Sequence, residues 1–343
     1  MMINFTERPK FSDNFSNWWR NLLAFFVVVL AIVTGLLYYR LDSDRQFYLA
    51  QFTSEKNVEG IKETNNLELE IGGDINVEKN LFLPTLSPSS TAISLNNFSA
   101  SNILVKDRES GLILFGKNTY EKHSLASITK LMTALVLLDQ GLDWDATTTV
   151  SADKVSGSDI YAGDTFTIAE LWDISLVASS NKAILTLVDF SSISREEFVN
   201  QMNQKARELG MVDSSFVEPT GLDARNISTP SDIVMLLEEA LNHKEIERPL
   251  NLHEVNLYSK EREKEIQAWN TDWLLLNWVP NKLNILGGKT GFIDDSLYNF
   301  TVAVEDNEGH IIDVVILGAS EHKLRFSEAK EVAEWTFANY IWE

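Results

Sequence analysis

The pattern of apolar and polar positions divides the chain into an apolar segment, a polar stretch and a region of alternating strand and helix patterns. Residues 21–39, NLLAFFVVVLAIVTGLLYY, contain no charged side chain. A helix of this length rises roughly 28 Å, about the thickness of the hydrocarbon core of a bilayer. Two tryptophans precede it, two tyrosines end it, and an arginine stands outside each end, as is typical of membrane interfaces. We therefore expect a transmembrane helix at 21–39.

A buried core helix and a cleaved signal peptide are the alternative interpretations of this segment. Core helices are seldom so uniformly apolar, and no small-x-small cleavage site follows before Arg40. Basic residues stand on both sides, so the positive-inside rule does not fix the orientation. We expect residues 1–20 to be cytoplasmic, on functional grounds alone. The protein would then be a single-pass protein of the cell membrane with an extracytoplasmic C-terminal part.

Residues 40–96 have the composition of a stalk or linker. Nine acidic and four basic residues lie between Leu41 and Leu81, without strong periodicity, and the run LPTLSPSSTA is rich in Pro, Ser and Thr. The sequence therefore predicts that the folded domain occupies residues 97–343.

Within this domain, strand patterns stand at both ends and helical patterns lie between them. The apolar runs 103–105 and 112–115, separated by KDRESG, predict a β-hairpin. Helices are expected at 129–140, 168–178, 182–187, 195–209, 231–241 and 326–340, and late strands at 298–304 and 311–319. Gly141 is a candidate C-terminal cap of the first of these helices. The order indicates an α/β fold with a mostly antiparallel sheet flanked by helices.

Composition and charge exclude several kinds of site and partner. The formal net charge of −21 and the pI near 4.6 argue against nucleic acid as a partner. The absence of cysteine excludes disulfides, thiolate catalysis and Cys-ligated metals. The five histidines show no metal-ligand spacing, so we expect neither a metal nor another cofactor.

Three short motifs carry the candidate chemistry. They are Ser127-Ile-Thr-Lys130, at the start of an apolar helix, then Ser179-Ser-Asn181, and then Lys289-Thr-Gly291, which is followed by a strand pattern. Each motif alone is common, but together and in this order they form the S-x-x-K, S-x-N and K-T-G set of penicillin-binding enzymes. A phosphate-binding loop is the alternative for GGKT, but Leu283 stands where its first glycine belongs.

The first motif places a nucleophile and a base on one helix face. Residues three apart on a helix are neighbours, so Lys130 lies one turn from Ser127. A lysine acts as general base only when burial or nearby cations lower its pKa. Apolar neighbours and a convergent Lys289 are both expected to act in this direction. The N–H of Ser127 would form half of an oxyanion hole, with the strand after Gly291 as the other half.

The other motifs suggest roles around this pair. Ser179 is expected to transfer a proton to the leaving group, and Asn181 to orient Lys130 and the substrate amide. Lys289 and Thr290 offer a positive charge and a hydroxyl to a substrate carboxylate. Gly291 would let the substrate lie close to the strand edge.

On these motifs the sequence resembles the low-molecular-weight D-alanyl-D-alanine carboxypeptidases, penicillin-binding serine peptidases of family S11. The runs SLASITKLMTALVLL, PTGLD and LGASEHKLRFSEAKEVAEWTF are also similar to those of the family. The resemblance covers about residues 98–340. It implies a β-lactamase/transpeptidase-like fold, in which the antiparallel sheet is flanked by helices and a helical subdomain is inserted.

The resemblance also implies an activity. Ser127 would attack the penultimate D-Ala carbonyl of a peptidoglycan stem peptide, release the terminal D-Ala, and form an ester that water hydrolyses. β-Lactams would inhibit the enzyme. A β-lactamase, a DD-endopeptidase and a catalytically silent peptidoglycan-binding domain are the alternatives.

The sequence departs from the family pattern at a few positions. Ser180 replaces a usual Gly, Ser296-Leu297 replaces an Ala-Gly pair, and Glu218 replaces an Asn. Two interpretations of Glu218 are open: a simple loop substitution, or a carboxylate that activates a deacylating water.

Overall fold

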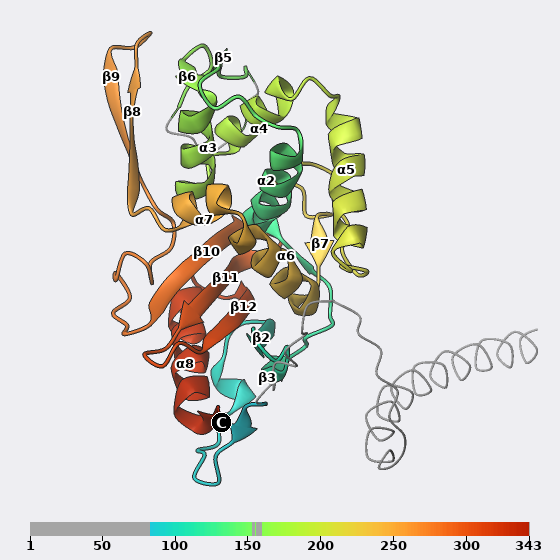
Figure 1. Cartoon of the computed structure of the whole chain (residues 1–343), viewed down its shortest axis with the longest axis vertical. Coiled ribbons are helices and arrows are strands. Elements are labelled where there is room, and N and C mark those ends of the chain that lie inside the picture. The colour runs from blue at the N-terminus through green and yellow to red at the C-terminus, as the bar shows by residue number, and fades with distance from the viewer. Residues whose placement is uncertain (1–82, 153–154, 156–159, 343) are drawn as a thin grey trace, which may run out of the picture. The chain divides into compact units, whose positions relative to one another are not determined.

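An antiparallel five-stranded sheet forms the centre of the part of the chain that the structure describes. The computed structural model describes residues 83–152, 155 and 160–342 (Figure 1). The sheet has the order β10-β11-β12-β2-β3, and each neighbouring pair is antiparallel. Its strands are β2 (Asn102–Asp107), β3 (Ile113–Lys117), β10 (Asn284–Ile293), β11 (Leu297–Glu305) and β12 (Ile311–Ala319). The predicted hairpin and late strands are therefore confirmed.

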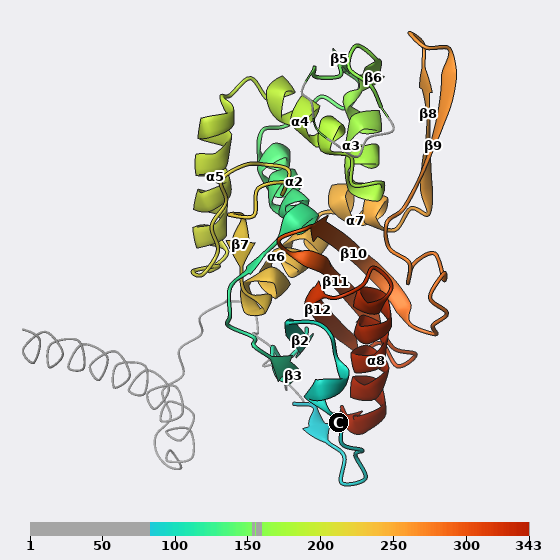
Figure 2. The same ribbon diagram turned by 180° about the vertical axis from the view of Figure 1, so that it is seen from behind.

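Helices cover both faces of this sheet. Helix α6 (Pro230–Asn242) lies in front of it in Figure 1, and α8 (Leu324–Asn339) lies over the opposite face in Figure 2. Alternate residues of β11 explain the two layers: Phe300 packs in the core cluster beneath α8, whereas Ala303 belongs to the cluster on the other face. The expected α/β architecture with a flanked antiparallel sheet is thus confirmed.

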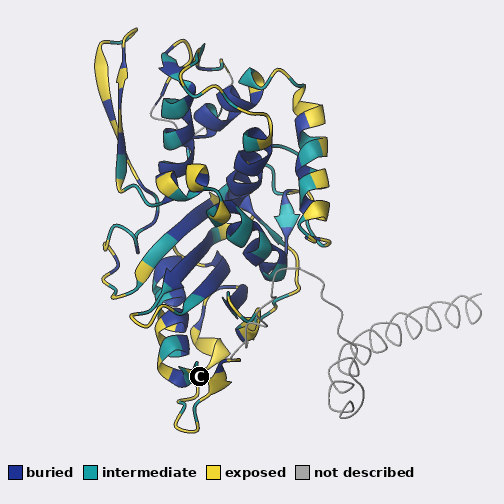
Figure 3. Ribbon diagram, in the orientation of Figure 1, coloured by how far each residue is buried: buried dark blue, intermediate teal, exposed yellow. Residues whose placement is uncertain are grey.

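A helical part is inserted in the sequence between β3 and β10. It contains α2 (Thr129–Asp139), α3 (Ile168–Val177), α4 (Asn181–Phe190) and α5 (Arg195–Glu208). Helix α2 is buried for most of its length, whereas α5 exposes one side (Figure 3). Side-chain caps explain where three of these helices begin, because Thr167, Ser180 and Ser194 each accept a hydrogen bond from a backbone N–H three residues later.

The remaining described elements are short segments, one further helix and a long hairpin. They are β1 (Thr85–Leu86), η1 (Leu95–Asn97), β4 (His123–Ser124), η2 (Ala126–Ile128), β5 (Thr147–Thr149), β6 (Thr165–Thr167), β7 (Ile227–Ser228), α7 (Lys244–Leu250), β8 (Glu254–Ser259), β9 (Lys264–Trp269) and β13 (Tyr340–Ile341). The sequence did not predict α7 or the β8–β9 hairpin. It also placed Lys289-Thr-Gly291 before a strand, whereas these residues lie within β10.

The folded domain begins before the boundary expected at residue 97. Strand β1 pairs with β13, and the Thr91 N–H donates to Asn339 Oδ1 over 2.6 Å. The content of Pro, Ser and Thr suggested a linker here, but backbone groups of this segment form hydrogen bonds with β13 and with Asn339 at the end of α8. The expected segments 1–20 and 21–39, and most of the expected stalk, lie outside the described residues. No helix within the described residues is long and apolar enough to cross a membrane.

An ion pair between Arg262 and the buried carboxylate of Asp164 fastens the tip of the β8–β9 hairpin to the loop before β6. Arg262 donates to both oxygens of Asp164, its Nη2 lying 2.7 Å from Oδ2, and Ser259 Oγ donates to Oδ1. Burial alone would raise the pKa of Asp164, but hydrogen bonds from Arg262, the Tyr161 backbone and Ser259 outweigh it and hold this pKa below its usual value.

Replacing Arg262 should therefore destabilise the domain in a pH-dependent way. We expect Arg262→Ala to lower the free energy of unfolding by about 2 kcal/mol at neutral pH, because it leaves a buried carboxylate without its cation. A depressed pKa stabilises the fold above the unfolded-state pKa, and this contribution is lost as the pH falls through the folded-state value. Urea unfolding at several pH values should thus show a difference that shrinks in acid. Lys260→Ala, at an exposed neighbouring position, is the control, and an equal loss there would contradict the prediction.

Candidate active site

The seven side chains and backbone positions singled out in the sequence come together around one cleft. Ser127 lies in η2. Ser179 lies between α3 and α4, Asn181 is the first residue of α4, and Thr290 and Gly291 lie in β10. These five line a cleft of about 520 Å³. Lys130 and Lys289 are buried, and their amines contact the hydroxyls of Ser127 and Ser179 in the cleft.

The amine of Lys130 is the most constrained group of the site. Its Nζ lies 2.8 Å from Ser127 Oγ, 2.6 Å from Asn181 Oδ1 and 2.8 Å from the Thr220 carbonyl oxygen. Burial lowers the pKa of Lys130 to about 7, although the nearby Glu218 carboxylate acts in the opposite direction. A neutral amine has two N–H donors and one lone pair. With Asn181 and Thr220 taking the donors, the lone pair points at the Ser127 hydroxyl, as a general base requires.

The second contact pairs the other serine and lysine. Lys289 Nζ donates to Ser179 Oγ over 2.9 Å and to the Thr290 carbonyl oxygen over 3.1 Å. Burial, followed by the charges of Lys130 and Arg325, lowers the pKa of Lys289 well below its usual value. We expected Lys289 to depress the pKa of Lys130. In the structure, burial is the largest cause of the lowered pKa at both lysines. The charge of the neighbouring lysine lowers the pKa of Lys289.

Strained backbone occurs at both serines of the site. Ala126, just before the nucleophile, has φ +47°, and Ser179 has φ +58°. Side chains other than glycine rarely adopt this conformation, which costs about 1–3 kcal/mol and persists only where the surroundings enforce it. The surrounding structure therefore over-determines the positions of Ser127 and Ser179.

Two glycines enclose the turn that carries Ser127. A Cβ at Gly221 would lie 1.9 Å from the Ala126 carbonyl oxygen, and one at Gly291 would lie 2.6 Å from the Leu125 carbonyl oxygen. The close approach at Gly291 thus involves the nucleophile turn, and an approach of the substrate to this glycine stays a prediction. The same Cβ would lie 3.2 Å from the Ser127 nitrogen. The Ser127 amide therefore adjoins strand β10, as an oxyanion hole shared between them would require.

Several cleft residues were not predicted from the sequence. Arg325, at the start of α8, donates through Nη1 to the Gly291 carbonyl oxygen over 3.0 Å, and burial lowers its pKa to about 10. It stays protonated at neutral pH. Burial and the Arg325 charge lower the pKa of His322 to about 4, so this ring is neutral. Both residues stand in a family-like run, but no spacing rule distinguishes them from ordinary helix residues. Thr271, Trp273 and Tyr298 complete this wall.

Glu218 faces its own loop. Its carboxylate accepts hydrogen bonds from the Thr220 and Gly221 backbone N–H groups at 2.7 and 2.5 Å, and from Asn226 Nδ2 at 2.9 Å. It lines a hollow that does not include Ser127 and shares no lining residue with the cleft. This placement favours a loop-stabilising role over activation of a water. Among the described residues, no cluster of three His, Asp or Glu side chains could hold a metal.

Comparisons with known proteins agree with this geometry. The family model described as D-alanyl-D-alanine carboxypeptidase, peptidase family S11, matches residues 89–320. The D-alanyl-D-alanine carboxypeptidase DacF of Bacillus subtilis is 30% identical over 250 residues, which are 70% of this chain and 63% of that protein. The D-alanyl-D-alanine endopeptidase of Haemophilus influenzae is 31% identical over 227 residues, which are 65% of this chain and 74% of that protein.

A solved structure shares the fold. Penicillin-binding protein D2 of Listeria monocytogenes, in its cefotaxime-bound form, is 26% identical, with a TM-score of 0.62 over 72% of this chain and 100% of that one. The match to DacF spans less than two thirds of that protein's length. Because the family model covers more than half of the sequence, the chain belongs to the D-alanyl-D-alanine carboxypeptidase family, peptidase family S11, and has its β-lactamase/transpeptidase-like fold.

Proposed function

We propose that this protein is a serine-type D-Ala-D-Ala carboxypeptidase that trims peptidoglycan stem peptides through an acyl-enzyme. One observation carries the proposal: a buried lysine amine with a pKa near 7 lies 2.8 Å from a serine hydroxyl at the floor of a cleft. Nucleophile and base are thus within hydrogen-bond reach in a folded site.

The reaction follows from these contacts. Ser127 Oγ attacks the carbonyl carbon of the penultimate D-Ala while its proton passes to Lys130. The negative charge on the carbonyl oxygen is stabilised by backbone N–H groups of Ser127 and the adjoining strand β10. The proton that Lys130 took from Ser127 is passed on through Ser179, which is hydrogen-bonded to Lys289, to the departing amine. The C–N bond breaks, D-alanine leaves, and Lys130 and Ser179 return to their starting protonation states. Water then hydrolyses the Ser127 ester and regenerates the hydroxyl.

The substrate carboxylate has cationic and hydroxyl partners in the cleft. The sequence suggested Lys289 and Thr290 for this role. Arg325 adds a charge that persists at neutral pH, and it lines the same cleft as Thr290. We infer that Thr290 and Arg325 bind the carboxylate, while Lys289 acts mainly through Ser179.

The alternatives differ in how they use the same site. A DD-endopeptidase is favoured by one observation, the relative of that name from Haemophilus influenzae. A β-lactamase would need fast hydrolysis of the acyl-enzyme, and the inward-facing Glu218 offers no support for it. A catalytically silent binding domain would not need the contact between Lys130 and Ser127. β-Lactams are expected to acylate Ser127 and so act as inhibitors.

We further propose that the catalytic domain is held outside the cytoplasmic membrane. The support is the uncharged run 21–39 with its aromatic and basic flanks. Residues 1–20 would then lie in the cytoplasm. Peptidoglycan lies on the extracytoplasmic side, so this orientation brings the cleft to its substrate.

Removing either member of the serine–lysine pair should abolish the chemistry. Ser127→Ala in the full chain should abolish release of D-alanine from a synthetic stem peptide and labelling by a fluorescent penicillin. Lys130→Ala should slow both by about 10³-fold or more, because it removes the base. Lys122→Ala, which removes a surface lysine paired with Asp213, is the control. A Lys130→Ala variant that labels at the wild-type rate would show that lysine is not the base.

The rate of acylation should report the pKa of Lys130. Its neutral fraction grows as the pH rises through about 7, so stopped-flow acylation by penicillin should accelerate between pH 6 and 8. Glu218→Gln removes a charge that raises this pKa, and the midpoint should therefore move to lower pH. The exposed Glu308→Gln makes the same change of charge and should leave the midpoint in place. A reduced rate at every pH with an unmoved midpoint would contradict the prediction.

The glycines that enclose the nucleophile turn can be tested with a matched pair. Gly221 and Gly141 both have positive φ, +87° and +68°, but a Cβ at Gly141 meets nothing within 4 Å. Both alanine variants bear a backbone cost of about 1 kcal/mol, measurable by thermal unfolding. Only Gly221→Ala should also displace Ser127 and reduce penicillin labelling, by about 100-fold. Equal labelling by the two variants would mean that Gly221 does not position the nucleophile.

A further inference from the structure

An exposed run of tryptophans continues the wall of the cleft onto the surface. Trp273 lines the cleft; its ring lies 5.7 Å from that of Trp278, which lies 6.0 Å from that of Trp269. Trp269 and Trp278 are 48% and 51% exposed. Contiguous exposed aromatic surface is unusual on a soluble domain and marks binding sites. We refer to Trp269, Trp273 and Trp278 as the tryptophan platform.

A strip of polar side chains lies beside the platform on the β8–β9 hairpin. Glu254 is the cross-strand partner of Trp269, and Asn256 is the partner of Gln267 on the next rung of the same face. Asn256 Nδ2 donates to Glu254 Oε1 over 2.9 Å, and Gln267 Nε2 donates to Oε2 over 2.6 Å. Glu254, Asn256 and Gln267, here called the polar strip, thus offer carboxylate and amide groups at fixed positions.

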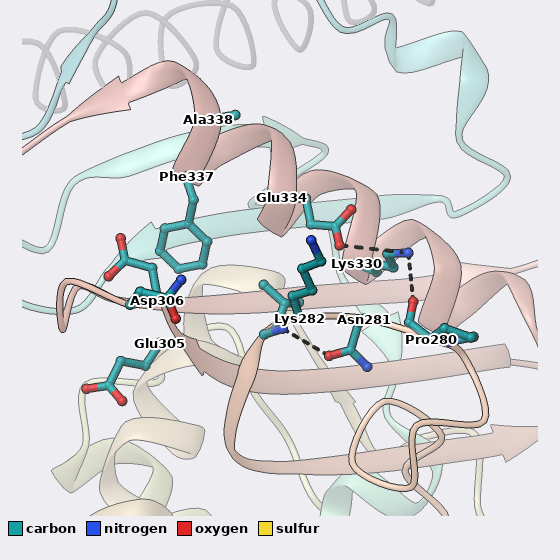
Figure 4. Close-up of a pocket in the computed structure, with 11 residues that line it drawn as sticks. Pro280, Asn281, Lys282, Glu305, Asp306, Lys330, Glu334, Phe337 and Ala338 are labelled. Carbon is teal, nitrogen blue, oxygen red and sulfur yellow. Dashed lines mark hydrogen bonds and ion pairs between the residues drawn. The ribbon is translucent and has the colours of Figure 1, made fainter.

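The platform is held in place before any ligand binds. The Val279 N–H donates to the Trp273 carbonyl oxygen over 3.1 Å, which closes the loop that carries Trp278. Next to it, Lys330 of α8 donates to the Pro280 carbonyl oxygen over 2.7 Å and pairs with Glu334 (Figure 4). A surface ordered in advance loses less conformational entropy on binding.

The chemistry of platform and strip selects the kind of ligand. Pyranose rings present flat C–H faces that stack on indoles and equatorial hydroxyl and N-acetyl groups that pair with carboxylates and amides. The carboxylate of Glu254 and the chain's net charge of −21 disfavour an anionic lipid surface. The platform is also continuous with the cleft that would receive the stem peptide, which in peptidoglycan is attached to a glycan strand.

We propose that the tryptophan platform and the polar strip bind the N-acetylated glycan strand of peptidoglycan while a stem peptide occupies the cleft. This inference rests on the proposed function, because it takes peptidoglycan as the substrate. It predicts that the enzyme prefers polymeric peptidoglycan to a free peptide, because the glycan contributes binding that a short peptide lacks.

The direct test measures binding without catalysis. The full-length protein is titrated with glycan strands from which the stem peptides have been removed, and quenching of tryptophan fluorescence and co-sedimentation are followed. The double variant Trp269→Ala/Trp278→Ala should bind about tenfold or more weakly. Glu254→Gln should also weaken binding, while Tyr120→Ala, at another exposed aromatic residue, should leave it unchanged. Release of D-alanine from a synthetic stem peptide should stay within about twofold of wild type in all three variants.

The outcomes separate this inference from the proposed function. Glycan binding by the wild type and its loss in the double variant support the platform even if no D-alanine is released, a result that would refute the carboxypeptidase alone. No binding by the wild type, or equal binding by the double variant, overturns the inference. The inference is also overturned if the double variant still binds the glycan strands but no longer binds anionic vesicles or a protein partner.

Discussion

The site depends on holding a lysine amine in the protein interior, where burial lowers its pKa to about 7. Lys130 is fully buried, and its amine meets three oxygen atoms from separate parts of the chain: Ser127, Asn181 and the Thr220 carbonyl. Transfer of a charged ammonium into such a place is costly, and the group responds by losing its proton. The fold therefore provides a base at neutral pH by burying the amine away from water, while the three oxygen atoms fix its position.

The same constraint requires three segments that are far apart in the sequence to pack closely against one another. The 217–222 loop supplies the Thr220 carbonyl and, through Gly221, lies directly against the Ala126 backbone. Strand β10 approaches the turn from the other side at Gly291. Glu218 keeps the loop in shape by accepting backbone N–H groups. A carboxylate close to the lysine raises its pKa, so the loop is stabilised at some expense to the base.

Residues with a local signature were predicted from the sequence. Periodicity identified the helices around α2 and the strands β11 and β12, and motif spacing identified the side chains that line or reach the cleft. Features that depend on contacts between residues far apart in the sequence were not predicted. The β8–β9 hairpin does carry a period-two pattern, with Val255, Leu257, Ile266 and Ala268 on its buried face, but this signal was missed. Its tip is held by Asp164, almost 100 positions away, which no local pattern shows. Arg325 matters because α8 brings it to the Gly291 carbonyl, which no local pattern shows. The segment 83–96 resembled a linker because its partners lie at the opposite end of the chain.

Strand β10 forms one margin of the central sheet, with β11 as its single neighbour among the strands described. Along that margin the main-chain N–H and C=O groups of successive residues alternate in direction, so those of residues 290–292 that turn away from β11 face the cleft. Another peptide chain can form main-chain hydrogen bonds with these groups only in an extended conformation, and this requirement does not depend on its side chains. Peptides of varied composition would thus be accepted if they can straighten, while folded or helical segments of other proteins would be refused.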